Sequence, residues 1–555
     1  MQHPFVPLVL LLLLPLGYFA QRLGGLDRVL VRWGLGLCGV AVLGAGVIAG
    51  GVDYPYLKRM NLGLAVAVAL VVALHRLGAG WLDRRRYRAA LVALAVVAWV
   101  VHLNFFAFHG TGQTRTYLQL HDVAHYYLGS KYFRELGYPD LYTGMLRAEA
   151  ELYDNHFRTV EARDLRSNML VDIRVLLSDS NAVKAQFTPQ RWTDFKQDVA
   201  YFHEAMGPQF ADVLHDFGYN PTPVWTLIGG GVANLVPAGS VVGIGCLGLL
   251  DLSLEAVMFL AIAWAFGVEA MLLAMIYFCI LFGASFGWIG GAFMRYLWLF
   301  GLVVGVCCLQ RGRYAAAGGL IALAALLRVF PAVFMVGMLA KASRELVASR
   351  RVSGRYARAL ASFAGTVLVL LGLTLVQPGG IRHWEQFRSN MERLLSDNVP
   401  TNFVGLTEVL AYRGALDVTA ERAAQTVERH ETVHRWQLLV LGPLLLVFIV
   451  RRGRTDDDLT VTLLAVPLIF SGLSIACYYY VLMLPLVCAY RDDAERLVLL
   501  FGIEAATYAL LLFEDREIVL YFYRNLLLLY LLVALLLDPV RAELAAIAPP
   551  RRAGR

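Results

Sequence analysis

Long apolar runs separated by short arginine-rich stretches constrain this chain more than any other feature of its sequence. The runs recur along all 555 residues, 58% of which are hydrophobic and only 16% charged. A soluble protein of this size could not bury so much apolar surface, so the pattern predicts a polytopic membrane protein. The arginines cluster between the runs, as membrane orientation signals do, so the net charge of +7 does not indicate a nucleic-acid partner.

The arginine clusters also predict the topology. The first run, 5–20, has no positive residue before it, and Arg22, Arg28 and Arg32 follow it. It therefore reads as a retained span with its N-terminus outside, and not as a signal peptide. The arginine-rich stretch 82–88 then predicts an inner face. Residues 109–222 would consequently lie outside the membrane.

We expect an all-α polytopic membrane protein of roughly fifteen crossings, since most runs are near the ~20 residues that a crossing needs. Six parts are predicted in chain order: N-terminal transmembrane helices (1–108), an extracytoplasmic loop with helical stretches at 140–160 and 188–214 (109–222), a transmembrane block (223–376), a second extracytoplasmic loop (377–437), C-terminal transmembrane helices (438–538) and a cytoplasmic tail (539–555). All seven cysteines fall in apolar runs, so no disulfide framework is expected.

Two short apolar arms meet at Arg328-Val329-Phe330-Pro331 and have basic residues at both outer ends. Each arm is about 13 residues, or about 20 Å of helix, which is too short for a hydrocarbon core of ~30 Å. We therefore expect a hairpin that turns within the membrane and lines a cavity.

The stretch His121-Asp122-Val123-Ala124-His125-Tyr126-Tyr127 follows the span that ends near Phe108 and is the first candidate site. A carboxylate there suits a general base that takes a proton from a hydroxyl, although an aspartate that caps a juxtamembrane helix is the simpler alternative. His121, His125 and Asp122 could also form a metal ligand set, but the segment lacks His-Glu-x-x-His character. We therefore expect no metal, and expect His121, His125, Tyr126 and Tyr127 to bind substrate.

Arg328 is the second candidate, because an arginine inside an apolar hairpin is costly and its planar fork suits phosphate. A snorkelling arginine, or an ion pair with Asp251, Glu255 or Glu269, is the alternative. Arg295 carries the same argument less strongly, since it lies near the outer end of its span. Asp251 and Glu255 could instead form a proton or cation path. The triplet Tyr478-Tyr479-Tyr480 is more typical of an interfacial aromatic belt than of a substrate-stacking element.

Several of these stretches together resemble a known family. They are Asp122 followed by Tyr126-Tyr127, then Gly137-Tyr138-Pro139-Asp140-Leu141-Tyr142, Ala317-Gly318-Gly319-Leu320, Leu327 to Pro331, Trp384, Asn402-Phe403-Val404-Gly405-Leu406, and the late tyrosine-rich span. From about His109 to Tyr490 the chain resembles glycosyltransferase family 87, mannosyltransferase-like members of the GT-C superfamily. It departs from that family's pattern in two places. The basic residue before Pro331 is arginine, Arg328, where lysine is usual, and Gly290 to Arg295 stands where a Gly-Gln pair is expected.

The resemblance implies a GT-C-like helical bundle that uses a polyprenyl-phosphate sugar, with Asp122 as general base and Arg328 on the donor phosphate. We therefore expect a membrane glycosyltransferase that moves a mannose-like sugar to an extracytoplasmic glycan, glycolipid or protein. Arg295, Arg382 and His383 would help to bind the donor. The composition favours a bacterial inner membrane, with the active site on its outer face. A transporter or flippase of a lipid-linked sugar, and an inactive scaffold with the same fold, are the alternatives.

Overall fold

The computed structural model describes residues 51–76, 82–109, 116–237, 241–396, 402–412, 420–454, 456–514 and 516–547. The predicted span at 5–20 with its following arginines, the predicted span at 33–52 up to residue 50, and Arg551, Arg552 and Arg555 of the tail lie outside this range. Helices dominate the described residues, and the six cysteines among them are unpaired.

Five helices of the described chain are long and apolar enough to cross a membrane. They are α3 (Tyr54–Arg76), the segment Gly243–Phe266 of α12 (Val241–Phe266), the segment Gly354–Leu375 that forms α18, the continuous segment Glu428–Arg452, and the segment Glu517–Leu536 of α27 (Glu517–Ile547). Leu368 and Val369 on α18 are exposed, as lipid-facing side chains would be. The chain is therefore a helical, membrane-associated protein, and the count of roughly fifteen crossings stays a prediction.

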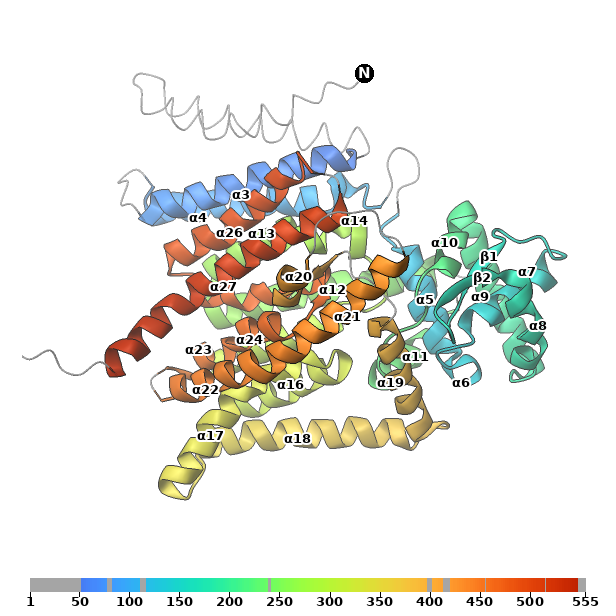
Figure 1. Cartoon of the computed structure of the whole chain (residues 1–555). Coiled ribbons are helices and arrows are strands. Elements are labelled where there is room, and N and C mark those ends of the chain that lie inside the picture. The colour runs from blue at the N-terminus through green and yellow to red at the C-terminus, as the bar shows by residue number, and fades with distance from the viewer. Residues whose placement is uncertain are drawn as a thin grey trace, which may run out of the picture.

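Shorter elements complete the bundle between these spans (Figure 1). The α-helices are α4 (Arg84–His102), α11 (Pro223–Ala233), α13 (Val268–Ile280), α14 (Phe286–Ile289), α15 (Leu297–Gln310), α16 (Tyr314–Leu327), α17 (Val336–Ser349), α19 (Gly380–Ser396), α20 (Leu406–Ala411), α21 (Ala420–Trp436), α22 (Gly442–Arg452), α23 (Asp458–Leu463), α24 (Ala465–Gly472), α25 (Leu484–Ala489) and α26 (Ala494–Leu510). Tighter or wider turns occur at Asn104–Phe106, Phe282–Ala284, Phe330–Met335, Gln437–Leu441 and Cys477–Met483, and strand β3 (Phe403–Val404) pairs antiparallel with β4 (Ile475–Ala476).

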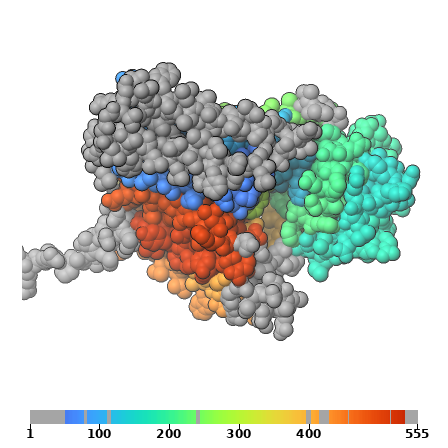
Figure 2. Space-filling model, turned by 90° about the horizontal axis from the view of Figure 1, so that it is seen from above, coloured from blue at the N-terminus to red at the C-terminus, as the bar shows by residue number. Residues whose placement is uncertain are grey.

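The segment between α4 and α11 gathers at one end of the bundle, as both the side view and the view from above show (Figures 1 and 2). We call this segment the loop domain. It contains α5 (Leu120–Lys131), α6 (Phe133–Leu136), α7 (Leu141–Leu152), strands β1 (Glu161–Asp164) and β2 (Met169–Asp172), α8 (Ile173–Lys184), α9 (Pro189–Met206), a turn at Gly207–Gln209 and α10 (Phe210–His215).

The loop domain is not wholly helical, which corrects the expected helical stretches. The stretch 140–160 remains helical only to Leu152, because Asp154 and Asn155 adopt positive φ angles of 49° and 61°. The antiparallel hairpin of β1 and β2 follows. The second stretch begins as expected, with Thr188 capping α9 and Pro189 in its first turn, but Gly207 at φ 56° separates α9 from α10.

The short hairpin near Arg328 has one regular arm and one irregular arm. Helix α16 ends at Leu327, and Phe330–Met335 forms a 3-10 turn before α17 continues to Ser349. Thr222, the N-cap of α11, donates its hydroxyl to the Leu326 carbonyl at 2.7 Å. This bond ties the return of the chain from the loop domain to the end of α16, next to Arg328.

Candidate functional site

Helix α5 is fixed against the bundle just before its first turn. The Gln119 amide N–H donates to the Gly291 carbonyl at 3.2 Å, and its side-chain Nε2 donates to the Trp288 carbonyl at 2.9 Å. Gly291 has φ 69°, and a Cβ there would collide with the Tyr117 carbonyl oxygen. Only glycine allows this close approach of two backbones. The start of α5 is consequently held beside the loop that leads into α15.

Asp122, in the first turn of α5, forms an ion pair with Arg295 from that same loop. The side chains of Asp122 and Arg295 are only 17% and 13% exposed. The pair is thus mostly shielded from water, where an unpaired carboxylate or guanidinium would be costly. The structure therefore brings together two of the predicted site residues.

Arg295 is positioned by its backbone as well as by its side chain. The buried carboxylate of Asp251, on α12, accepts the N–H groups of Arg295 and Tyr296, both at 3.2 Å. Met294, immediately before, has a positive φ of 49°, a backbone conformation that a non-glycine residue adopts at a cost. The carboxylate of Asp251 thus stabilises the backbone conformation at Arg295. Of the acids offered as partners for Arg328, Glu269 instead pairs with Arg84 and Arg88 of α4.

Arg328 contacts the same side of α5 as Arg295 does. Its Nη2 donates to the hydroxyl of Tyr126 at 2.9 Å, and Tyr126 stands one helical turn after Asp122. The Tyr126 ring packs edge-on against Trp225, with ring centroids 4.8 Å apart. Trp225 Nε1 in turn donates to the Met294 carbonyl at 3.4 Å. Asp122, Tyr126, Arg295 and Arg328 therefore form one connected group, which we call the arginine face of α5.

Two tyrosines complete the arginine face. The Arg295 guanidinium lies 4.6 Å from the centre of the Tyr478 ring, and that of Arg328 lies 6.0 Å from the centre of Tyr479. Tyr479 also packs edge-on against Phe330, at 4.9 Å. Two cations over aromatic rings form a surface suited to an anion with an attached apolar or sugar moiety.

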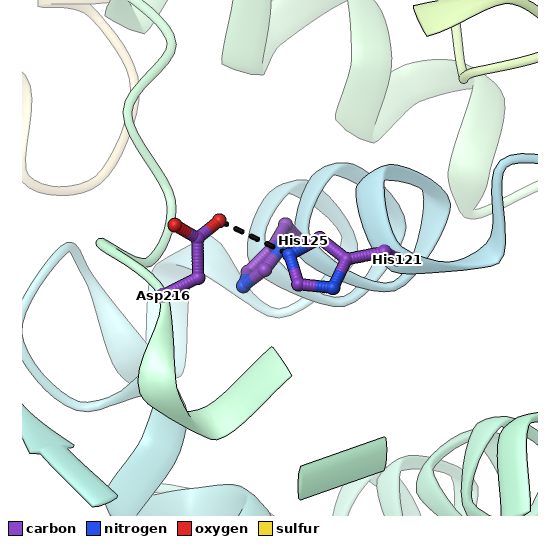
Figure 3. Close-up of side chains that lie close together, drawn as sticks. All are labelled: His121, His125 and Asp216. Carbon is purple, nitrogen blue, oxygen red and sulfur yellow. Dashed lines mark hydrogen bonds and ion pairs between the residues drawn. The ribbon is translucent and has the colours of Figure 1, made fainter. Parts of the chain in front are cut away.

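A second face of α5 points into the loop domain. His121 and His125, also one turn apart, lie beside Asp216, which follows α10 (Figure 3). Nε2 of His121 lies 3.1 Å from Asp216 Oδ2, and Nε2 of His125 lies 2.7 Å from the Tyr142 hydroxyl and 3.2 Å from the Val213 carbonyl. We call these residues the histidine face.

The carboxylate beside the two histidines is Asp216, and not Asp122, which the sequence suggested as part of a possible ligand set although no metal was expected. Successive residues of an α-helix are turned by about 100°, so Asp122 faces Arg295 while His121 faces Asp216. Burial lowers the pKa of His125 to about 4. Burial by itself would raise the pKa of Asp216, but the hydrogen bond from His121 and the nearby His125 lower it to about 2.

The other predicted site residues lie elsewhere. Tyr127 is fully buried, and its hydroxyl contacts the Val236 carbonyl at 2.6 Å and Lys131 Nζ at 2.6 Å. His383, on α19, packs edge-on against Phe133 at 4.7 Å, and the neighbouring Arg382 is exposed. Within the described residues, neither Arg382 nor His383 shares a hydrogen bond or ion pair with Asp122, Arg295 or Arg328.

Sequence reasoning missed Trp225 and Asp216, and it interpreted Tyr478 and Tyr479 as an interfacial belt. Tyr478 and Tyr479 could have been found from the predicted topology, which places their segment at the same outer end as Arg295. Nothing in the sequence around Asp216 distinguishes it from other loop aspartates. A cavity of about 450 Å³ also opens beside Gln119, lined by Lys58, His102 and His109 among others, and none of the predicted site residues lines it.

Comparison with family models, with curated proteins and with solved structures gave no match for this chain.

Proposed function

We propose that this protein is a membrane glycosyltransferase that transfers a mannose-like sugar from a polyprenyl-phosphate donor to an extracytoplasmic acceptor. The observation that carries the proposal is the arginine face, where a shielded carboxylate and two guanidinium groups meet at the base of the loop domain. The resemblance of the sequence to glycosyltransferase family 87 supports the same assignment for Asp122 and Arg328. Five helices of the described chain are long and apolar enough to cross a membrane, which suits a protein that handles a polyprenyl lipid.

The roles follow from the chemistry of the groups. An acceptor hydroxyl attacks the anomeric carbon and gives its proton to Asp122, while the bond from that carbon to the phosphate oxygen breaks. The lipid phosphate leaves with the bonding electrons, and its negative charge is held by Arg328 and Arg295. In the absence of donor, Arg295 neutralises Asp122. When the phosphate draws Arg295 away, the carboxylate becomes a stronger base.

The test uses the full chain in proteoliposomes, with radiolabelled polyprenyl-phosphate mannose and a membrane extract as acceptor source. Wild type is compared with Asp122→Asn and Arg328→Gln. Asp179→Asn and Arg174→Gln, at exposed positions of α8, are matched controls. We expect label in a new product with wild type and both controls, and its loss in the two site variants.

If Asp122→Asn transferred sugar as fast as wild type does, Asp122 would not be the general base. If wild type carried label across the bilayer without forming a new glycosidic bond, the transporter alternative would replace the enzyme. If it produced neither result with mannose or with a second donor sugar, the scaffold alternative would replace both.

A further inference from the structure

The histidine face is a cluster of metal-ligating side chains that the proposed sugar transfer does not use. One ligand atom from each of His121, His125 and Asp216 lies within 4.8 Å of the other two. Two histidines four residues apart on one helical face are the spacing by which helices present a pair of imidazoles to a metal. The carboxylate comes from a separate segment, as third ligands of such sites commonly do.

We propose that His121, His125 and Asp216 bind a divalent transition metal of the zinc class. Two imidazole nitrogens and one carboxylate oxygen are a donor set typical of zinc, and they leave a fourth position open for water or another ligand. Ligand atoms around tetrahedral zinc stand roughly 3.3 Å apart, since each bond is about 2.0–2.1 Å long. His121 and Asp216 already meet that spacing at 3.1 Å, so only a side-chain adjustment of His125 is needed.

The surroundings of His125 fix its ring in one orientation, as those of a metal-binding histidine do. The residue is 3% exposed, and Nε2 of its ring contacts the Tyr142 hydroxyl and the Val213 carbonyl. The Gly218 N–H donates to the same Tyr142 hydroxyl at 3.0 Å, which fixes the tyrosine. Metal-binding histidines usually have such partners on the ring nitrogen that does not bind the metal, and these partners set the ring orientation. Both contacts of His125 use Nε2, which leaves Nδ1 for the ion.

A metal can reach this cluster from the solvent. The side chains of His121 and Asp216 are 30% and 42% exposed, in contrast to His125. The bound ion would connect α5 to the segment between α10 and α11. It would thereby fasten α5, the helix that carries Asp122, to the later part of the loop domain, without contacting the arginine face.

An ordinary ion pair between His121 and Asp216 accounts for two of the three residues. His125 has structural partners of its own, the Tyr142 hydroxyl and the Val213 carbonyl, which hold its ring with or without an ion. The two explanations differ in a measurable way, because only a metal site recruits all three side chains to one ion.

The experiment titrates Co²⁺ into the full chain in nanodiscs. The protein is purified with a tag that contains no histidine, treated with a chelator and dialysed. Visible d–d absorption reports Co²⁺ bound to nitrogen and oxygen ligands, and Zn²⁺ is then added as competitor. We expect one Co²⁺ per chain, displacement by Zn²⁺, and no displacement by Mg²⁺, which prefers oxygen ligands.

The variants His121→Ala and Asp216→Asn should each weaken Co²⁺ binding at least tenfold. His156→Ala, at an exposed histidine of the loop domain, should leave binding unchanged. Thermal unfolding without metal shows whether each variant is folded, and Zn²⁺ should raise the Tm of wild type but not of Asp216→Asn.

The absence of Co²⁺ bands in folded wild type would overturn the proposal whatever the variants do. Bands of equal strength in folded His121→Ala and Asp216→Asn would overturn it as well, since the ion would then be bound elsewhere. These readouts do not involve sugar transfer, so the metal site and the proposed enzyme can fail separately.

Discussion

The two faces of α5 have the same residue spacing but contact different parts of the protein. Each presents two side chains one turn apart, Asp122 and Tyr126 on one face and His121 and His125 on the other. The arginine face contacts the helical bundle, through Arg295 and Arg328. The histidine face contacts the loop domain, through Tyr142 and Asp216. Neighbouring residues are turned by about 100° around the helix axis, so adjacent positions of α5 belong to the arginine face and to the histidine face.

The comparison shows that α5 is the element through which the loop domain and the bundle are coupled. The partners of the histidine face come from the same loop domain, 17 and 95 residues away in sequence. Arg328 is 202 residues away from Tyr126. The arginine face therefore forms only when the whole bundle is assembled, whereas the histidine face can form with the loop domain.

The largest expected effect is on the rate of sugar transfer, and it distinguishes the two faces of α5. Asp122→Asn should reduce sugar transfer by roughly 10²–10⁴-fold, the usual contribution of a general base. Because Asp122 points away from Asp216, the same variant should bind Co²⁺ as wild type does. Transfer is measured in proteoliposomes and Co²⁺ binding by visible absorption on the same preparation. A parallel loss of both would mean that the two faces act as one site.

A second prediction concerns the support of the histidine face. Glu151, on the same helix as Tyr142, accepts hydrogen bonds from Lys184 at 2.7 Å and Trp192 at 3.0 Å. Burial opposes ionisation of Glu151, but the bonds from Lys184 and Trp192 prevail and lower its pKa to about 2. A lowered folded-state pKa contributes stability that is present above pH 4.5 and is lost as the pH falls toward 2.

Glu151→Gln should therefore destabilise the loop domain by about 1 kcal/mol at neutral pH, because solvent screens these partly exposed ion pairs. Its stability should also change less between pH 5 and pH 3 than that of wild type. Hydrogen exchange of the α7 amides measures both effects, and Glu161→Gln, at an exposed position of β1, is the control. An unchanged pH dependence in Glu151→Gln would show that other carboxylates govern the acid lability.

The comparison also shows how far the sequence could predict the site. The positions of the arginine clusters predicted that Asp122 and Arg295 lie near the outer ends of membrane spans, and the length of the two short arms predicted the turn at Arg328. Both predictions depend only on local composition and on the length of the apolar runs. Which way Asp122 points was beyond such reasoning, since it depends on the rotation of α5 set by Gln119 and Gly291. Asp216 was missed for the same reason, because only the folded chain brings it to His121.

A third prediction compares the ion pairs of the two faces by double-mutant cycles. The Asp122–Arg295 pair is mostly shielded, so Asp122→Asn combined with Arg295→Gln should give a coupling free energy of about 1–3 kcal/mol. The His121–Asp216 pair is more exposed, so His121→Ala combined with Asp216→Asn should give less than about 1 kcal/mol without metal. Thermal unfolding in detergent measures both cycles, and addition of Zn²⁺ should increase only the second coupling.

The same substitution, tyrosine to phenylalanine, can be made on each face. Tyr126→Phe removes the acceptor of Arg328, and Tyr142→Phe removes the hydroxyl beside His125, so each should cost about 1–2 kcal/mol of stability. Their other consequences should differ. Tyr126→Phe should raise the KM for the lipid donor and leave Co²⁺ affinity unchanged, while Tyr142→Phe should weaken Co²⁺ binding about tenfold. If Tyr126→Phe weakened Co²⁺ binding as much as Tyr142→Phe does, the two faces of α5 would not be independent, because the loss of a hydroxyl that is bonded to Arg328 would then be felt at His125.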